Sequence, residues 1–509
     1  MMNTAKGRKR GAALALVVIF GLVLSILAAA VFTLFQSNVS SYTYVRDRLQ
    51  ARYSAEAGVN LAVHMIMGGA DIPQGIMPVQ FLPEPPAGGF YQMPGDDLGR
   101  VMVYVDPNDR NDQVAIANAY AVRALAVIGS GDSTYTYGME TMVLPENFAR
   151  FATFLNDPPL DGFYGDGYRF DGPFFANGPV CLYSSSSSSA DDVWFYRFSL
   201  ASDYYIYGPN EASGSRQTSP QWGNLTVQPI ERMLMGAPYF ELGADPIPFG
   251  PGEVNWQDTR SAAQSGGLLF TAAQIPDRTR MILRGSEYGD TLFVKTGRDA
   301  AVQKFFLGDL TNRVIWIDNA ASSRIYLKGY PNYSPWSDPI SPDGLREPLT
   351  IGCNGSIYAS GSLQYHDRDI MNIDNRTLLG LVMVHGNFVI ALDPDLVGSV
   401  VDWPDGMWKI VTDSDVEYDC TVMVLEGEFR AEDHRYPYPK ADFMFVGGYI
   451  VNREGYTTFG NQGWDTVIFY DSRLMTMHPP FFPQTGRWDT AYWEEQPNLT
   501  EYLIGVNQD

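Results

Sequence analysis

The longest hydrophobic run of the chain lies near its N-terminus. Residues Ala12 to Phe35 include no charged side chain. As a helix they span about 36 Å, enough to cross a bilayer core of about 30 Å. A cleaved secretory signal has a shorter apolar core of roughly 7 to 15 residues. The run therefore predicts a membrane helix.

The pattern beyond this run predicts that the helix continues. Residues 36–67 contain no Pro and only one Gly, Gly58. Apolar side chains recur at steps of mostly three or four, which is typical of one helical face. They are Tyr42, Val45, Leu49, Tyr53, Val59, Val63 and Ile66. We predict one helix over 12–67, with a transmembrane and an amphipathic part, about 80 Å long.

Alternating apolar positions predict β-structure after the helix. Residues 68–99 are rich in Pro and Gly and are expected to form a hinge. Residues 100–147 alternate like strands with turns at Gly129 and Gly131, which predicts a small sheet packed against the long helix. The fold class predicted is mainly β with one long N-terminal α-helix.

A recurring glycine pattern favours a solenoid over residues 148–463. A short apolar segment, a Gly and a resumed apolar segment occur at Gly178, Gly361, Gly386, Gly427 and Gly448. If the separation of Gly386 and Gly427 counts as two turns, the period is about 20 to 25 residues, as in a parallel β-helix. A β-sandwich with Gly turns is the alternative. The Ser run 184–189 is expected to be a surface loop.

The C-terminal segment 464–509 is dense in aromatic side chains. A solenoid needs a cap over its open apolar end, so we predict a cap here, with carbohydrate stacking as the alternative. The aromatic residues are Trp464, Phe469, Tyr470, Phe481, Phe482, Trp488, Tyr492 and Trp493.

Composition and charge fit a folded acidic protein. Hydrophobic residues make up 45% and charged residues 18% of the chain, which predicts a folded protein. The length of 509 residues predicts two to four structural units. The net charge is −23, although Lys6, Arg8, Lys9 and Arg10 precede the apolar run. This balance argues against a nucleic-acid partner. The basic cluster predicts a cytoplasmic N-terminus, with the bulk of the chain outside.

No cofactor or metal site is predicted. Cys181, Cys353 and Cys420 show no metal-ligand spacing, and one disulfide or three buried thiols are equally compatible with them. The acidic turn at 106–112 lacks the glycine and distal acid of an EF-hand and has Arg110 in place of a ligand. We interpret it as an Asx-rich hairpin turn.

The N-terminal region resembles a known family. A short basic leader ending at Gly11, the apolar run and the sequence YSAEAG at 53–58 follow one another. Together they resemble the PilX-type minor pilins of type IV pili and, more loosely, the large tip pseudopilin of type II secretion. The resemblance implies that a prepilin peptidase cuts between Gly11 and Ala12, and that the new amine is methylated.

The same resemblance implies two positions for assembly. Most pilins have a glutamate at the fifth mature position, where this chain has Leu16. A carboxylate in a bilayer is costly unless it has a partner. A subunit that lacks this glutamate cannot form the same charge pair, which suits a minor or tip role. Glu56 is the second position, although its spacing from Arg52 predicts an ordinary helix ion pair. An uncleaved single-span anchor is the alternative.

Two hypotheses for function remain. In the first, the chain is a pilin-like minor subunit of the bacterial inner membrane. It then enters a pilus, with other pilins or pseudopilins as partners and a head for assembly or adhesion to a glycan or protein. In the second, a membrane-tethered β-helix binds or cleaves polysaccharide. We name no catalytic residue, because His434 and the acids Glu426, Glu428, Asp433 and Asp471 form no known catalytic pattern.

Overall fold

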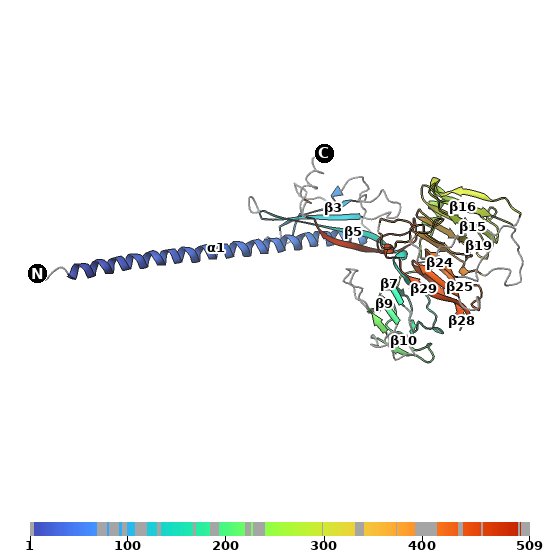
Figure 1. Ribbon diagram of the computed structural model, residues 1–509, viewed down its shortest axis with the longest axis horizontal. Helices are drawn as coiled ribbons and strands as arrows, with labels where there is room; N and C mark the ends of the chain where they lie inside the picture. Colours follow the sequence, from blue (N-terminus) through green and yellow to red (C-terminus); the bar gives the residue numbers. More distant parts are fainter. Residues whose placement is uncertain are drawn as a thin grey trace. The chain divides into compact units, whose positions relative to one another are not determined.

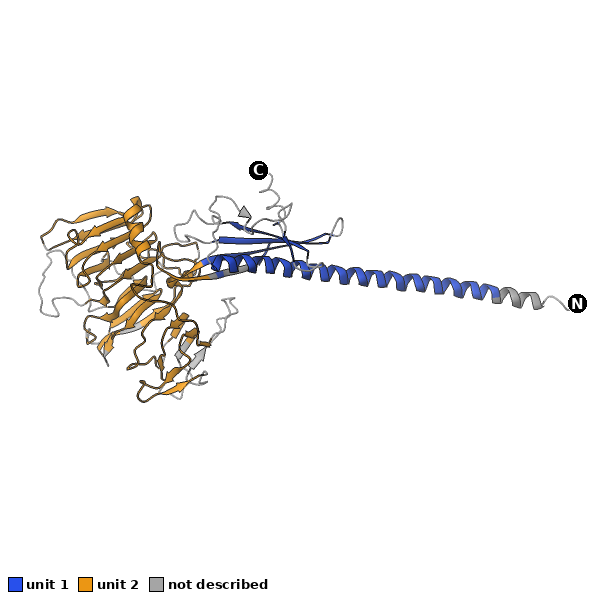
Figure 2. Cartoon of the chain, turned by 180° about the vertical axis from the view of Figure 1, so that it is seen from behind, with its two compact units in different colours: residues 1–109, 119–144, 490–509 blue, residues 110–118, 145–489 orange. Residues whose placement is uncertain are grey.

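The computed structural model divides the chain into two compact units (Figure 2). Unit 1 comprises residues 1–109, 119–144 and 490–509, and unit 2 comprises residues 110–118 and 145–489. The residues that the structure describes are 5–68, 79–80, 91–93, 99–106, 120–129, 134–165, 169–183, 193–218, 225–227, 240–297, 299–330, 340–372, 374–391, 415–435, 441–459, 462–496 and 499.

Unit 1 begins with one uninterrupted helix, α1 (Ala5–Met67), which confirms the long N-terminal helix. Large apolar side chains from Leu14 to Phe35 are exposed along its first part. Within Leu14–Met67 the helix is long and apolar enough to cross a membrane, by length and composition. The second part of α1 packs along an antiparallel sheet (Figure 1).

The sheet of unit 1 is antiparallel where its strand pairing is described, and its strand order is β1-β3-β4-β5-β30, with β2 also paired to β3. Its strands are β1 (Val79–Gln80), β2 (Tyr91–Gln92), β3 (Arg100–Asp106), β4 (Tyr120–Ile128), β5 (Tyr135–Asn147) and β30 (Gln484–Glu495). The small sheet predicted at 100–147 corresponds to β3, β4 and β5. No sequence pattern indicated that β30, from the C-terminal region, would join them.

Small residues form the face of α1 that packs on the sheet. The buried side of the helix consists of Ala51, Ser54, Ala55, Gly58, Val59, Ala62, Val63 and Ile66. The predicted helical face was right at its last three positions. The first four, Tyr42, Val45, Leu49 and Tyr53, are exposed and do not contact the sheet side of the helix. The backbone of the helix approaches β3 and β4 too closely for large side chains, as the contacts of Gly58 show.

Unit 2 is a stack of coils built from parallel strands, which favours the predicted β-helix over a β-sandwich. Its first sheet has the spatial order β14 (Leu268–Thr271), β18 (Val314–Asp318), β20 (Leu349–Cys353), β22 (Leu379–Met383), β25 (Thr421–Ala431), β27 (Tyr449–Glu454), β6 (Thr153–Leu155), β7 (Arg169–Ala176) and β9 (Val193–Leu200). Both β12 (Leu225–Val227) and β13 (Phe240–Leu242) pair in parallel with β9.

Two further sheets complete the coils. The second contains β17 (Gln303–Phe306), β16 (Thr291–Lys295), β15 (Thr279–Arg284), β19 (Arg324–Gly329), β21 (Ser356–Ala359) and β23 (Phe388–Ile390), and then the later part of β25. The third contains β24 (Val416–Asp419), β26 (Ala441–Val446), β29 (Gln462–Phe469) and β28 (Thr458–Phe459).

The remaining elements of unit 2 are short. A separate small sheet contains β8 (Cys181–Leu182), β10 (Tyr205–Tyr207) and β11 (Ser215–Gln217). The helical segments are α2 (Gln257–Gly266), η2 (Phe148–Arg150), η4 (Leu307–Asp309) and η6 (Ser472–Met475). Most of the predicted hinge 68–99, residues 107–112 of the predicted Asx-rich turn and the Ser run 184–189 lie outside the described residues.

The interior of the stack holds rows of like side chains, one from each coil. Phe174 stacks on Phe198 with ring centroids 5.4 Å apart, and Phe388 stacks on Phe429 at 4.9 Å. Aliphatic residues form similar rows within the same buried cluster. Because each coil buries its face only against its neighbours, these rows stabilise the stack as a whole.

The predicted period of 20 to 25 residues was wrong for part of the stack. Leu381 pairs directly with Val422 in the next coil, so the separation of 41 residues is one turn rather than two. A Cβ atom on Gly427 would lie 2.2 Å from the carbonyl oxygen of Gly386, which places these two glycines in adjacent coils. Insertions of different length between strands leave the stacking intact but change the spacing along the sequence.

The aromatic C-terminal segment lies within and along the stack. Trp464 of β29 is fully buried in the core, where β29 pairs in parallel with β26. The chain then runs along the side of several coils, because the hydroxyl groups of Thr259 and Thr350 donate to the carbonyl oxygens of Phe481 and Pro480.

Candidate functional site

The residues that the resemblance singled out lie along α1. Gly11 and Ala12 lie within the helix, and the Leu16 side chain is exposed. Arg52 Nε donates to Glu56 Oε1 at 2.8 Å, the pairing expected from their spacing. These positions follow one another along a single helix and do not converge on one site. Their roles in processing and assembly stay predictions.

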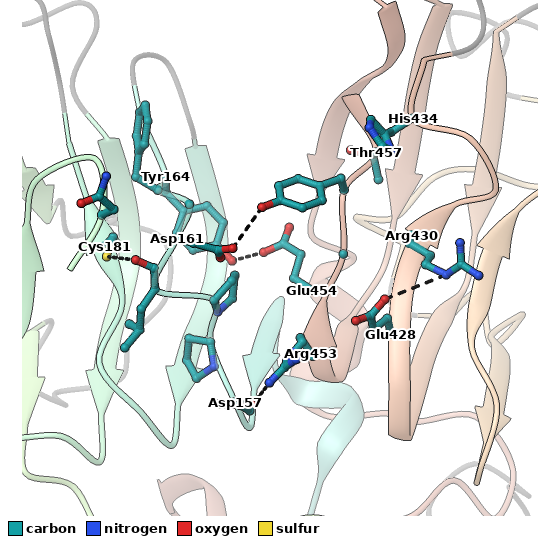
Figure 3. A pocket seen from close by; sticks show the side chains of 18 of the residues that line it. Asp157, Asp161, Tyr164, Cys181, Glu428, Arg430, His434, Arg453, Glu454 and Thr457 are labelled. Carbon is teal, nitrogen blue, oxygen red and sulfur yellow. Dashed lines mark hydrogen bonds and ion pairs between the residues drawn. The ribbon is translucent and has the colours of Figure 1, made fainter. Parts of the chain in front are cut away.

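Two of the five candidates for chemistry in the head line one groove, and three do not. Glu428 and His434 lie in its wall (Figure 3). Glu426 pairs with His385, whose Nδ1 lies 2.6 Å from Glu426 Oε2 outside the groove. Buried Asp471 accepts three hydrogen bonds from the guanidinium of Arg473, and Asp433 accepts one from the N–H of Arg435. The hypothesis of polysaccharide binding or cleavage stays a prediction.

The three cysteines are buried as free thiols. Burial raises the pKa of Cys181 to about 11 and that of Cys353 to about 12. Such thiols are poor nucleophiles, because the reactive form is the thiolate. Among the described residues, no group of three or more His, Cys, Asp or Glu side chains could hold a metal ion.

The groove lies at a seam in the stack. Here β27, late in the chain, pairs in parallel with β6, early in the chain, through Tyr449 with Thr153 and Val451 with Leu155. The first sheet is therefore continuous across the seam. The pairing ends where the N–H of Asp157 donates to the carbonyl oxygen of Asn452 at 2.7 Å.

Two prolines direct the chain away from this ladder. Pro158 and Pro159 follow Asp157 and have no N–H to donate, so regular pairing cannot continue through them. The chain returns to a sheet at Tyr164, which pairs with Leu182 on the side of the next coil. No backbone hydrogen bond joins residues 160–165 to residues 453–457, all of which the structure describes. The small sheet that Tyr164 joins is thus split from the end of β27 at the seam.

The split forms a groove with a volume of about 1120 Å³. One wall consists of residues 157–164 with parts of 181 and 210–212, and the other of residues from 428–434 and 453–458. Figure 3 shows side chains from both walls approaching one another. The volume exceeds the roughly 300–1,000 Å³ of most small-molecule sites.

A carboxyl group lies between the two walls. The hydroxyl of Tyr164 donates a short hydrogen bond to Glu454 Oε2 across the seam. Burial raises the pKa of Glu454 above its usual value, and the hydrogen bond from Tyr164 offsets only part of this rise. Tyr164 is itself anchored in the core, because its ring packs edge-to-face on Phe170 and Phe174. This pair therefore bridges the two walls of the groove.

The lining of the groove is predominantly acidic. Among the described residues that line the groove, six are acids and two are arginines. Both arginines have acidic partners: Arg453 pairs with Asp157 across the seam, and Arg430 Nε lies 3.9 Å from Glu428 Oε2. The acids are Asp157, Asp161, Glu211, Glu428, Glu432 and Glu454.

Sequence reasoning missed most of this site. It considered Glu428 and His434 but not Asp161, Tyr164 or Glu454. The adjacent prolines 158–159 were a local sign that a strand ends there. No local pattern could show that Asp157 meets Arg453, because 296 positions separate them.

Comparisons with known proteins show similarity to solved structures. No protein family and no curated protein matches the sequence. Among solved structures, the chain is similar to the competence-associated pilin ComZ from Thermus thermophilus, with 11% sequence identity. The alignment covers 88% of this chain and 97% of that chain, with a TM-score of 0.24. Because this score is low, the fold is defined by the strand pairing of the chain itself.

Proposed function

We propose that this chain is a pilin-like minor subunit that is inserted among other pilins through α1 and displays unit 2 as its head. The observation that carries the proposal is the division of α1 into two parts. From Leu14 to Phe35 its apolar side chains are exposed, whereas from Ala51 to Ile66 one face is buried on an antiparallel sheet. A helix of this kind is both an anchor and a part of a folded unit.

The exposed part needs an apolar environment. Exposed apolar surface costs roughly 25 cal/mol for each Å² that a partner or a lipid bilayer could cover. A bilayer supplies that cover before assembly, and the helices of neighbouring subunits supply it afterwards. The proposed location is therefore the bacterial inner membrane, with the N-terminus in the cytoplasm, followed by the pilus or cell surface.

Leu16 supports a minor rather than a bulk role. An ionised carboxylate within the apolar run would need a partner such as the amine of a neighbouring subunit. Leu16 is apolar and exposed, so it can pack against lipid or helices but cannot form that charge pair. The proposal thus places this subunit where the pair is not required, such as the end of a fibre.

Processing of the N-terminus tests the proposal. The full-length protein would be co-expressed with a prepilin peptidase and its intact mass measured, with Gly11→Leu as the control variant. We expect the wild type to lose residues 1–11 and to carry a methyl group on Ala12, while the variant keeps the leader. A wild-type protein that keeps residues 1–11 would instead be an uncleaved single-span anchor.

A further inference from the structure

The groove in unit 2 has the features of an unfilled strand position. We propose that it binds an extended, positively charged peptide segment of a partner protein, which adds as a strand between the chain at Tyr164, beside the small sheet, and the end of β27. The inference does not depend on how α1 is processed or assembled. It rests on the backbone of the two walls, on their charge and on the size of the groove.

The first wall presents backbone groups toward the groove. The N–H of Tyr164 donates to the carbonyl oxygen of Cys181 at 3.0 Å, and the carbonyl oxygen of Tyr164 accepts from Tyr183 at 3.0 Å. Both groups of Tyr164 therefore point away from the groove. In a parallel strand, alternate residues bond to opposite sides. Tyr164 forms a single bridge of this kind, so the backbone groups of its neighbour Phe163, which lines the groove, are directed to the other side, and no described residue bonds to them.

The second wall follows the same rule. The N–H of Gly455 donates to the carbonyl oxygen of Phe429 at 2.8 Å, on the side of β25. Glu454 is paired directly opposite Phe429, so the backbone N–H and carbonyl of Glu454 point to the other side, toward the groove. Two facing strand edges with available backbone groups are the basis of recognition by strand addition.

The charge of the groove selects the partner. Its six acids outnumber its two arginines, and both arginines already pair with acids. An acidic peptide would be repelled, whereas Lys and Arg side chains would find carboxylates on both walls. The rings of Phe163 and Tyr456 line the two walls and are 47% and 60% exposed, which adds surfaces for cation–π contact.

The size of the groove agrees with a short strand. A segment of four to six residues spans about 13–20 Å at ~3.3 Å per residue. The volume of about 1120 Å³ is larger than a single sugar or nucleotide would fill. Insertion of a strand would also cover the sheet edges, which are otherwise a site for uncontrolled association.

A synthetic peptide tests the inference directly. The probe is a fluorescent peptide of sequence KVRVKVR, and its binding to the full-length protein in detergent micelles is measured by anisotropy. We expect saturable binding, no binding of the acidic counterpart EVEVEVE, and about tenfold weaker binding when alternate backbone nitrogens are methylated. Hydrogen exchange should slow in segments 163–165 and 453–455 when KVRVKVR is bound.

Variants locate the site. Glu211→Gln combined with Glu428→Gln removes one charge from each wall, and we expect about fivefold weaker binding at low salt. Glu426→Gln is the matched control, because it lies on the same strand as Glu428 but outside the groove. We expect it to bind like the wild type.

Several results would overturn the proposal. Absence of binding at about 1 mM peptide would contradict the proposal. A dissociation constant of about 1 mM corresponds to a binding free energy of roughly −4 kcal/mol. Equal binding of the N-methylated peptide would show ionic attraction without strand addition. Dissociation of protein dimers on addition of the peptide would identify a second copy of the chain as the occupant, and displacement of the peptide by a neutral glycan would identify a sugar.

Discussion

Glu417 and Asp419 of β24 place two carboxyl groups in the interior of unit 2, where each residue is 1% exposed. Arg368 Nη2 lies 3.4 Å from Glu417 Oε2, and the backbone N–H of Tyr365 donates to Asp419 Oδ2 at 2.8 Å. One arginine cannot balance two buried carboxylates. Burial, and then the charge of Glu417, raise the pKa of Asp419 well above its usual value. We therefore expect the pair to keep one proton at neutral pH.

Asp419→Asn should make the free energy of unfolding less dependent on pH. The unfolded chain releases the Asp419 proton near pH 4, whereas the folded chain holds it to higher pH. Between the two pKa values the folded state binds more protons, so stability falls by up to about 1.4 kcal/mol per pH unit as pH rises. Asn cannot titrate, and this contribution disappears. Guanidinium unfolding of the wild type and the variant at about pH 5 and pH 8 would measure this difference. An equal change in the free energy of unfolding between the two pH values for both proteins would contradict the prediction.

At the scale of elements, the contact between α1 and its sheet depends on the absence of a side chain. A Cβ atom on Gly58 would lie 2.7 Å from Val101 Cγ2 and 3.1 Å from Val103 Cγ2. These distances leave no room for a methyl group. Packing on the sheet therefore explains the small residues of the YSAEAG segment, because Ser54, Ala55 and Gly58 are its buried positions.

Gly58→Leu should destabilise unit 1 by about 1–3 kcal/mol, the usual cost of overpacking. Gly21→Leu is the control, because no atom lies within 4 Å of the Cβ position at Gly21 in the same helix. We expect the control to unfold like the wild type in guanidinium, measured in detergent micelles. If both variants lost the same stability, the cause would be the helix itself rather than its packing on the sheet.

These elements also show how far the sequence could predict the structure. Periodicity found the helix, and it placed Val59, Val63 and Ile66 on the buried face. It failed at Tyr42 because the rule favours large apolar residues, whereas close approach to a sheet favours small ones. Recurring glycines indicated stacked parallel coils but not their period, because insertions change the spacing. The groove could not be predicted, since its two walls come from coils at opposite ends of the head sequence.

At the largest scale, the path of the chain differs from a simple solenoid. After β6 the coils continue through β7 and β9 to one end of the stack. Residues 243–256 then run back along it, with Ile247 bonded to Asn177 and Trp256 stacked on Trp316 at 5.3 Å. From β14 the coils return to β27, which pairs with β6. The coil of β6, early in the chain, thus stacks on the coil of β27, late in the chain. Because of this pairing, unit 2 cannot fold completely until most of the chain has been synthesised.

The seam that results from this path is held by a row of asparagines. Asn452 Nδ2 donates to the carbonyl oxygen of Glu426 at 3.0 Å, Asn156 Nδ2 to Asn452 Oδ1 at 2.9 Å, and Asn177 Nδ2 to Asn156 Oδ1 at 2.8 Å. The middle member links coils that are distant in sequence. Its removal would break two of these bonds together.

Asn156→Ala should therefore cost about 1–3 kcal/mol, because two hydrogen bonds are lost and their partners remain partly buried. The exposed Asn255, whose side chain bonds only locally to Asp258, supplies the control variant Asn255→Ala. Hydrogen exchange should rise in segments 153–155 and 449–451 of Asn156→Ala before it rises elsewhere in unit 2. If hydrogen exchange rose first in β14 or β9 instead, the ends of the stack rather than the seam would limit the stability of unit 2.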